Sequence, residues 1–484
     1  MSSMEADVIV IAGGPAGLAA AIGAAEGGAS VILFEKGSTT GGTANMGMGP
    51  FAVESRLQKA KQIDLTKDQA FKIFMDYTHW RVDAKLVRAF INKSADTIDW
   101  LEKMGVVFVD AASYFPGANF TWHIVQPESG KPGPTAAATM TKIMTEQARK
   151  LGVKILLQTP VKKIVKQGDR ITGVIAEDRS GNDIQADGKV VIVATGGFGD
   201  NPKMIKKYTE YEYGKDMYNF RVPGVEGDGI RMTWEVGGAK TAMDMEMIYG
   251  IPDGGLDFGL MAIFHQPNFM VNLLGERFVN EDLMGNATFT GNAIAAQKDR
   301  CGFAIFDTGI KEHYEKDGFD HPLGIAPDLR VEDVEATIQD SINQGCPNLF
   351  IADSLEELAE KTGIDLEGLK ENLAEYNLNC EKGRDPLFSR NWEHLHALKG
   401  PRYYACKNMP SAYGSLGGIK INYKTEVLDK EWKKIPGLYA AGTDACTIFG
   451  DSYVFVLPGN TMGFALNTGR IAGENAVKYI NSLG

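Results

Sequence analysis

The turn that begins at Ala12 combines residue types and spacing suited to binding a pyrophosphate. It reads Ala12-Gly13-Gly14-Pro15-Ala16-Gly17, follows an apolar run at residues 8–11, and precedes an alanine-rich stretch and a second apolar run that ends at Glu35. Bare backbone can approach a pyrophosphate, helix N-terminal amides attract its charge, and an acid after the second strand accepts from ribose hydroxyls. This order predicts a dinucleotide-binding βαβ unit, in which Ala12 places a methyl group where the usual pattern has a glycine.

Small residues recur at other places that could line the same ligand. The loop at residues 37–50 is rich in glycine, so its backbone can pass close to a planar ring and offer amide donors. The apolar run at residues 190–193 leads into Ala194-Thr195-Gly196-Gly197, which predicts the carboxyl edge of a parallel sheet, where ligands bind. Strand and glycine patterns return at residues 437–444 and 458–460, so we expect the C-terminal part to complete the N-terminal domain.

Several other segments predict how these turns are positioned. Apolar residues recur at helical spacing over residues 64–104, and two alternating segments at residues 161–167 and 171–178 predict a hairpin or meander. Residues 114–123 gather aromatics with a histidine, which is consistent either with the wall of a substrate pocket or with a packed loop. From about residue 232 to residue 401 short apolar strands become rarer, which indicates a second domain.

Length and composition exclude several classes of protein. At 484 residues we expect two domains, and the net charge of −12 disfavours nucleic acid or an anionic membrane as a partner. No stretch resembles a membrane span or a signal peptide, so we expect no membrane insertion and a soluble, cytoplasmic protein. The cysteines are odd in number and widely spaced, which argues against disulfides, structural zinc, iron–sulfur clusters or haem, and we expect no metal site. They are Cys301, Cys346, Cys380, Cys406 and Cys446.

Five motifs in order resemble those of the fumarate reductase and succinate dehydrogenase flavoprotein family, which includes 3-ketosteroid dehydrogenases and urocanate reductases. The resemblance covers nearly the whole chain. The motifs are the N-terminal βαβ unit, ATGGF at residues 194–198, GDGI at residues 227–230, GERFVNE at residues 275–281, and GLYAAGTD at residues 437–444 with the terminal GRIAGENA at residues 469–476.

This resemblance implies an α/β fold: a Rossmann-like FAD-binding domain of glutathione-reductase type, discontinuous in sequence, with an inserted α+β capping domain. The FAD-binding segments would be residues 1–231 and 406–484, and the capping domain residues 232–405. The residues expected to contact or surround FAD are Ala12, Gly13, Gly14, Pro15, Ala16, Gly17, Glu35, Lys36, Gly41, Gly42, Thr43, Ala44, Met46, Gly47, Val161, Ala194, Thr195, Gly196, Gly197, Asp228, Gly442, Thr443, Asp444, Gly459, Asn460 and Met462.

Three polar residues of the dicarboxylate-reducing members are missing from this sequence. The catalytic arginine is replaced by Gly285 and the active-site histidine by Gly414, while the second carboxylate-binding arginine would fall near Val456. A buried carboxylate without cationic partners loses charge-assisted hydrogen bonds of about 1.5–3 kcal/mol each. We therefore expect neither fumarate nor succinate as the substrate, and we expect a more apolar substrate face.

No motif names the residue that moves the proton. The resemblance implies hydride transfer between flavin N5 and a carbon of a C–C bond next to a carbonyl, with an acid or base handling the other proton. The candidates are Tyr453, Asp451, His265, Tyr413 and His123, each of which could instead be a packing residue. Residues 36–50, where relatives attach flavin covalently, contain no histidine, so we expect noncovalent FAD.

The first hypothesis is a soluble FAD-dependent oxidoreductase acting on a non-dicarboxylate, mostly apolar, cyclic enone or ketone. Its electrons would pass to or from a separate carrier or a diffusible acceptor. One alternative is a 3-ketosteroid dehydrogenase proper, since residues 414–418 resemble that branch, although Gly285 and Leu457 replace its tyrosines. Another alternative is a flavoprotein electron-transfer subunit with a degenerate active site.

Overall fold

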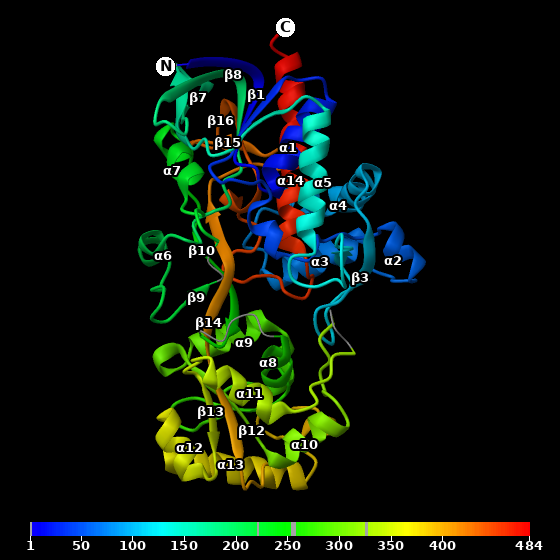
Figure 1. Cartoon of the computed structure of the whole chain (residues 1–484), viewed down its shortest axis with the longest axis vertical. Helices are drawn as coiled ribbons and strands as arrows, with labels where there is room; N and C mark the ends of the chain where they lie inside the picture. The colour runs from blue at the N-terminus through cyan, green and yellow to red at the C-terminus, as the bar shows by residue number, and fades with distance from the viewer. Residues whose placement is uncertain (1, 220–221, 253–257, 325–327) are drawn as a thin grey trace.

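A parallel sheet centred on β1 (Ser2–Ile11) forms one end of the molecule (Figure 1). The computed structural model describes residues 2–219, 222–252, 258–324 and 328–484. In it β1 pairs with β2 (Val31–Phe34) on one side and with β8 (Asp183–Val193) on the other, and β5 (Lys154–Leu156) and β16 (Lys434–Ala440) extend the sheet. Since β16 lies near the C-terminus, the sheet is discontinuous in sequence, and the predicted α/β class is confirmed.

Three antiparallel pairings complete this sheet. β6 (Val161–Gln167) and β7 (Arg170–Glu177) form the hairpin predicted from the alternating segments, and β7 continues onto the first half of β8. β15 (Glu426–Leu428) pairs with β16 and closes the opposite edge. β8 pairs in parallel with β1 along its length, and only its last residues, before the 194–197 turn, also pair in parallel with β16.

Two helices that begin far apart in sequence pack backbone to backbone on this sheet. α1 (Pro15–Glu26) and α14 (Asn460–Asn481) lie side by side with α5 (Ala137–Lys150) in Figure 1. A Cβ atom on Gly469 would lie 2.2 Å from the carbonyl oxygen of Ala16, and one on Gly473 would lie 2.4 Å from that of Ala20. Only glycine permits this approach, so the two helices fix each other's position.

The helical interpretation of residues 64–104 is confirmed. α3 (Lys67–Tyr77) begins with a capping box between Thr66 and Gln69, and α4 (Ala84–Met104) begins at Asp83 and ends at a left-handed Gly105. The neighbouring elements are α2 (Arg56–Ala60), β3 (Phe108–Ala112), β4 (Trp122–Val125), α6 (Pro202–Tyr208), β9 (Tyr218–Asn219), α7 (Asp228–Glu235) and the short helices η1 (Gly42–Met46) and η5 (Gly442–Asp444).

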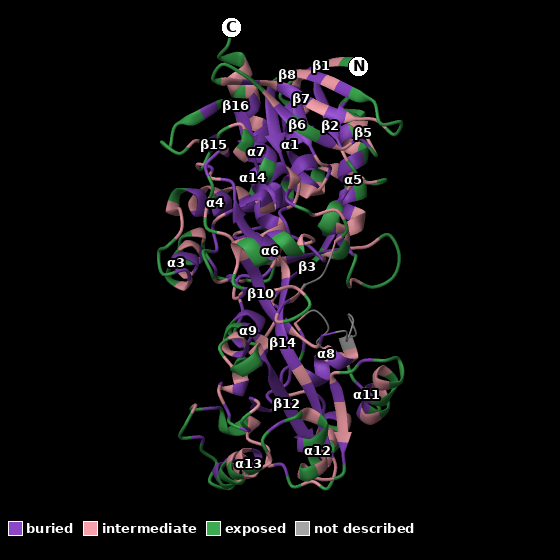
Figure 2. Cartoon of the chain, turned by 90° about the vertical axis from the view of Figure 1, so that its left-hand side faces the viewer, coloured by how far each residue is buried: buried purple, intermediate pink, exposed green. Residues whose placement is uncertain are grey.

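A second sheet is organised around one long strand, β14 (Tyr403–Gly418), which runs between the two ends of the molecule (Figure 1). Its first residues pair with β12 (Gly302–Asp307) and β13 (Leu349–Ala352), and its later residues pair with β10 (Asp244–Gly250) and β17 (Ala445–Cys446). β11 (Phe269–Val271) extends β12. Figure 2 shows that most of β14 is buried.

Helices surround this second sheet at the end opposite β1. They are α8 (Phe258–Phe264), η2 (Glu281–Gly285), α9 (Ala287–Ala295), η3 (Lys298–Arg300), α10 (Thr308–Lys316), α11 (Val334–Asn343), α12 (Leu355–Thr362), α13 (Leu366–Glu381) and η4 (Trp392–His394). We propose that residues 232–405 form the capping domain, called the cap below, with β14 continuing out of it. Among the described residues, no helix combines the length and apolar character needed to cross a membrane.

The GERFVNE run supplies a buried ion cluster inside the cap. Arg277 donates from Nε and Nη2 to the two carboxylate oxygens of Glu281, at 2.8 and 2.6 Å, and from Nη2 to Asp385 at 2.8 Å. The Glu281 and Asp385 side chains are fully buried. Burial raises and pairing lowers the pKa of Asp385, with a net lowering, so this carboxylate stays charged. This run therefore supports the cap structurally.

Removing the cation from this cluster should be strongly destabilising. Arg277→Met removes the hydrogen-bonded cation from Glu281 and Asp385, leaving Glu281 only Arg390 at 3.7 Å, and we expect a loss of about 3–5 kcal/mol in the free energy of unfolding. Urea unfolding monitored by circular dichroism measures it. Lys72→Met breaks the exposed pair with Asp76 and should change stability by less than about 0.5 kcal/mol. Equal effects of the two substitutions would contradict this assignment.

Candidate active site

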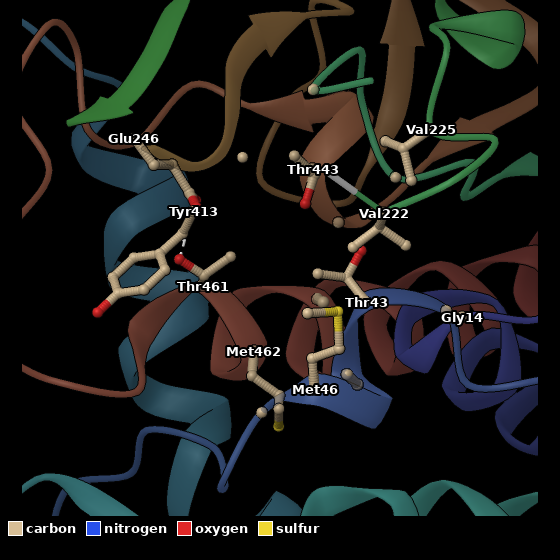
Figure 3. A pocket seen from close by; sticks show the side chains of 18 of the residues that line it. Gly14, Thr43, Met46, Val222, Val225, Glu246, Tyr413, Thr443, Thr461 and Met462 are labelled. Atoms are coloured by element: carbon tan, nitrogen blue, oxygen red, sulfur yellow. Dashed lines mark hydrogen bonds between the residues drawn. The ribbon is translucent and has the colours of Figure 1, made fainter. Parts of the chain in front are cut away.

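One continuous cavity runs from the turn before α1 to the second sheet. Figure 3 shows Gly14 at one end and Glu246, Tyr413 and Thr461 at the other, with Met46 and Met462 between them. The cavity is lined by these residues from the predicted FAD-contacting set: Ala12, Gly14, Pro15, Ala16, Glu35, Lys36, Gly42, Thr43, Ala44, Met46, Gly47, Val161, Ala194, Thr195, Gly196, Asp228, Gly442, Thr443, Gly459 and Met462. Gly13, Gly17, Gly41, Gly197, Asn460 and Asp444 are not among its lining residues.

The first turn has the geometry needed to cradle a phosphate. Ala12 has a φ of 77°, so its methyl group is accommodated in a left-handed conformation that glycine adopts more readily. A Cβ on Gly17 would lie 1.9 Å from the carbonyl oxygen of Ala12, whereas a Cβ on Gly14 would meet no protein atom within 4 Å. α1 begins at Pro15 without a side-chain cap, so its first amides are open to an anion in the cavity.

Acidic side chains fix the edges of this end of the cavity. Glu35 accepts from the backbone amides of Gly13 and Gly37, at 2.7 and 2.5 Å, which holds its carboxylate at the end of β2. Lys36 pairs with Asp228 at 2.7 Å across the cavity mouth. These contacts fit the ribose and phosphate groups of a dinucleotide, whose hydroxyls need an acceptor such as Glu35.

Asp444 supports the turn at residues 194–197 from behind. It is fully buried and accepts hydrogen bonds from the backbone amides of Thr195 and Gly197 and from Thr195 Oγ1. Burial raises its pKa to about 6, and these hydrogen bonds favour its charged form. Asp444 therefore shapes the loop that faces the cavity.

A bulge in the second sheet directs three residues toward the other end of the cavity. Met245 pairs with Ser415 and Met247 pairs with Ala412, so Tyr413 and Gly414 together oppose Glu246. Such a two-against-one arrangement turns side chains out of the regular alternation. Glu246, Tyr413 and Gly414 all line the cavity as a result.

Glu246 is a buried carboxyl group with one hydrogen-bonded oxygen and one that faces Gly414. Thr461 Oγ1 lies 2.8 Å from Glu246 Oε1 (Figure 3). It also lies 3.1 Å from the Tyr453 hydroxyl, so Tyr453 can donate to Thr461 while Thr461 donates to Glu246. A Cβ on Gly414 would lie 3.3 Å from Glu246 Oε2. Burial raises the pKa of Glu246 to about 7, and Thr461 lowers it in part. This group can hold a proton near neutral pH.

Aromatic rings form the walls around this carboxyl group. Phe455 packs against Tyr114 at 4.8 Å between ring centroids and stacks on Phe115 at 5.8 Å. The ring centroids of Tyr413 and Tyr453 are 6.2 Å apart. The Phe, Tyr and Trp residues that line the cavity are Phe34, Tyr114, Trp122, Tyr218, Tyr249, Tyr413, Tyr453 and Phe455. Of the described residues that line the cavity, Lys36 is the only lysine or arginine, and it lies at the dinucleotide end.

Gly285, Val456 and Gly414, where the dicarboxylate-reducing proteins have polar side chains, are each in contact with neighbouring groups of this protein. A Cβ on Gly285 would lie 2.9 Å from Cβ of Phe115, so the Phe115 ring takes the space that a longer side chain would need. Val456 uses its carbonyl to accept from the amide and side chain of Asn119, both at 3.0 Å. The space next to Gly414 is taken by Glu246.

The structure divides the five proton-donor candidates. Tyr453, Tyr413 and His265 line the cavity. His265 is buried against Tyr249, with ring centroids 4.6 Å apart, and burial lowers its pKa to about 4, so it is neutral. Asp451 does not line the cavity, because it pairs on the surface with Arg81 at 2.8 and 2.9 Å.

His123 does not line the cavity either. Its ring is fully buried, with Nε2 2.6 Å from Ser55 Oγ and Nδ1 3.0 Å from the carbonyl oxygen of Thr121. Both ring nitrogens are therefore used in structural hydrogen bonds, and neither His123 nor Asp451 is placed to reach a ligand in the cavity. The position of this histidine in an aromatic loop gave no sign of its partner Ser55.

Sequence reasoning missed Glu246 and Thr461. The available signal was the carboxylate of Glu246 between Met245 and Met247, inside a part of β10, residues 245–249, that is otherwise apolar and is buried. A buried acid needs either a hydrogen-bonding partner or a proton, so it is a candidate functional residue.

Comparison with known proteins agrees with this geometry. Residues 7–461 match the family described as FAD binding domain. The chain is 33% identical to vinyl phenol reductase from Lactiplantibacillus plantarum, covering 98% of this chain and 96% of that one. It is 30% identical to fumarate reductase (cytochrome) from Shewanella frigidimarina, covering 98% and 77%. The structure of 3-ketosteroid-delta4-(5alpha)-dehydrogenase from Rhodococcus jostii shows the same fold, with a TM-score of 0.78 and 24% sequence identity. The match covers 99% of this chain and 98% of that one.

Adding a methyl group to the turn should weaken cofactor binding without unfolding the protein. Gly14→Ala places a Cβ in space that no protein atom occupies within 4 Å, facing the cavity. We expect FAD affinity to fall by at least about tenfold, equivalent to about 1.4 kcal/mol, with an unchanged circular dichroism spectrum. Flavin fluorescence titration of the apoprotein measures the affinity. Gly309→Ala, on an exposed part of α10, is the control, and equal affinities of the two variants would count against the predicted site.

Proposed function

The chain belongs to the FAD binding domain family, and from that premise we propose that this FAD-dependent oxidoreductase acts on a C=C bond in a mostly apolar, cyclic substrate that carries no carboxylate. The observation that supports the substrate class most directly is the aromatic chamber around Glu246, which no described lysine or arginine lines. A dicarboxylate in this chamber would lose charge-assisted hydrogen bonds of about 1.5–3 kcal/mol each. The likeness to vinyl phenol reductase favours a double bond conjugated to a phenol ring or to a carbonyl.

The residues around the chamber suit one proton transfer. Bound FAD would supply or accept the hydride at one carbon of the double bond. Glu246, protonated on Oε2 near neutral pH, would donate the proton to the neighbouring carbon, so that two hydrogens are added in total. Thr461 would then donate to Oε1 and stabilise the carboxylate that remains. Tyr453 keeps Thr461 in this orientation.

Aromatic and neutral polar groups would orient the substrate. Tyr413 and Phe455, whose rings stack with centroids 6.4 Å apart, form an aromatic wall against which a cyclic substrate would pack. Neutral His265 lines the cavity beside Tyr249 and could hydrogen bond a phenol or carbonyl oxygen, whereas the Tyr249 hydroxyl already donates to the Met284 carbonyl at 2.9 Å. Because an acid is present in the chamber, we favour an active enzyme over an electron-transfer subunit with a degenerate site. We further propose that FAD is held noncovalently and that a separate carrier or diffusible compound exchanges its electrons.

The substrate class can be tested directly. Enzyme reduced under anaerobic conditions should be reoxidised in stopped-flow experiments by a vinyl phenol or a cyclic enone, because the chamber accepts apolar rings. Recovery of the oxidised flavin absorbance is the measurement. Fumarate should cause no recovery above the rate without substrate. Rapid reoxidation by fumarate, or none by any ring compound in either redox state, would refute the proposed substrate class.

The pH dependence tests the role of Glu246. Its pKa is raised to about 7, so the proton-donating form is present below that pH and is lost as the pH rises through it. The rate of double-bond reduction should therefore fall above about pH 7. Glu246→Gln should lower this rate by about 100-fold and remove this pH limb, as general acids typically contribute 100-fold or more.

His123→Gln is the matched control, because His123 is equally buried but lies outside the cavity lining. It should keep the pH limb even where it lowers stability. Flavin content and the oxidised flavin spectrum verify that each variant is loaded. A Glu246→Gln enzyme with the wild-type pH profile would exclude this carboxyl group as the donor.

A further inference from the structure

Two histidines and an aspartate converge in the cap, outside the active site. His313 lies on α10, and Asp320 and His396 come from two segments without regular structure. His313 Nε2 is 2.9 Å from Asp320 Oδ1, and His396 Nε2 is 3.0 Å from Asp320 Oδ2. The three possible ligand atoms lie within 4.8 Å of one another. Metal bonds of about 2.0–2.2 Å place neighbouring ligand atoms about 3 Å apart, and the two distances from Asp320 to the histidines match this spacing.

A second carboxylate orients one of these ligands. Asp317, at the C-terminal end of α10, has its Oδ2 3.1 Å from Nδ1 of His313. A histidine that binds metal through one nitrogen usually donates its other N–H to a carboxylate, which fixes the ring and its tautomer. Here that arrangement leaves His313 Nε2 facing Asp320. Such an outer carboxylate is a feature of metal sites that an isolated ion pair does not need.

The charge and accessibility of the cluster favour a divalent cation. The side chains of His313, Asp320 and His396 are 29%, 11% and 30% exposed, so an ion can enter and keep water ligands. Among the described residues, no lysine or arginine forms an ion pair with Asp320 or Asp317; Arg330 donates only to the backbone carbonyl of Asp317. Asp317 and Asp320 bring two carboxylates to the cluster, and a divalent ion would balance their charge.

We propose that His313, Asp320 and His396 bind one divalent first-row transition metal ion of the Zn²⁺ type, with water completing its coordination. Two imidazoles and one carboxylate are ligands suited to Zn²⁺, and three protein ligands leave at least one open position. All three come from the cap, so the ion would join the end of α10 to the segment that follows η4.

A neighbouring cluster provides a contrast. Asp282, His321 and His394 also lie within 4.8 Å of one another by their possible ligand atoms. Arg390, whose side chain is fully buried, has its Nε 3.7 Å from Asp282 Oδ1. A guanidinium at that distance repels a second cation, so we assign the metal to the first cluster alone.

The proposed ion would stiffen a segment that reaches the active-site cavity. His321, next to Asp320, exchanges two hydrogen bonds with Gln266: its amide donates to Gln266 Oε1 at 2.8 Å, and Gln266 Nε2 donates to its carbonyl at 3.0 Å. Gln266 follows His265, which lines the cavity. Metal binding should therefore raise the melting temperature of the protein as well as being detectable by itself.

Calorimetric titration of Zn²⁺ into the tag-free, FAD-loaded, chelator-treated full chain tests the site. We expect one equivalent to bind and the melting temperature to rise. His313→Gln and His396→Gln should each weaken binding by at least about tenfold, and Asp317→Asn, which keeps all three ligands, by about 10–100-fold. His394→Gln, the matched control in the neighbouring cluster, should bind as the wild type does.

Absence of Zn²⁺ binding by the wild type would overturn the proposal, leaving the cluster as hydrogen-bonded ion pairs. So would a loss of binding in His394→Gln with wild-type affinity in His396→Gln, since that places the ion in the neighbouring cluster. FAD content and circular dichroism establish that each variant is folded. If a ligand variant fails to fold, the affinity of Asp317→Asn, which keeps all three ligands, still tests the site.

Discussion

The close approach of α1 and α14 is the constraint on which the cavity depends. Gly469 and Gly473 let the α14 backbone contact the carbonyls of Ala16 and Ala20, so the two helices run in the same direction at a fixed offset. α14 begins nine residues before Gly469, and at 1.5 Å per residue its first turn extends about 13 Å beyond the start of α1. One helix can therefore face the phosphates while the other carries Thr461 to the far end of the same cavity.

This offset explains which parts of the site could be predicted from the sequence. The turn at residues 12–17 and Glu35 lie within one βαβ unit, so their spacing along the chain already determines their spacing in space. Glu246 and Thr461 are 215 residues apart and meet only because β10 and α14 end at the same cavity. Local patterns carry no information about such a meeting, and residue type alone selected Asp451 and His123, whose partners Arg81 and Ser55 are 370 and 68 residues away in sequence.

The buried glutamates Glu281 and Glu246 are stabilised in two different ways, and this difference distinguishes a structural carboxylate from one that can transfer a proton. Glu281 shares the Arg277 guanidinium with Asp385 in the cap, and Arg390 Nη1 lies 3.7 Å from Glu281, so permanent cations face these carboxylates. Glu246 has no such cation, and its burial raises its pKa to about 7. A carboxyl group that is balanced by a proton can exchange it, whereas one balanced by arginine cannot at any ordinary pH. The same residue type thus supports the cap in one place and offers acid catalysis in another.

β14 joins these two regions as one strand. It pairs with β12 and β13 in the cap and with β10 beside the cavity, without a break over its 16 residues. The bulge opposite Glu246 lies within the pairs with β10, between Ala412 and Ser415, and it presents Tyr413 and Gly414 to the cavity. Since β10, β12 and β13 all lie within residues 232–405, a rigid displacement of the cap carries this bulge with it. Any motion of the cap is therefore coupled to the position of the acid and the aromatic wall that would hold the substrate.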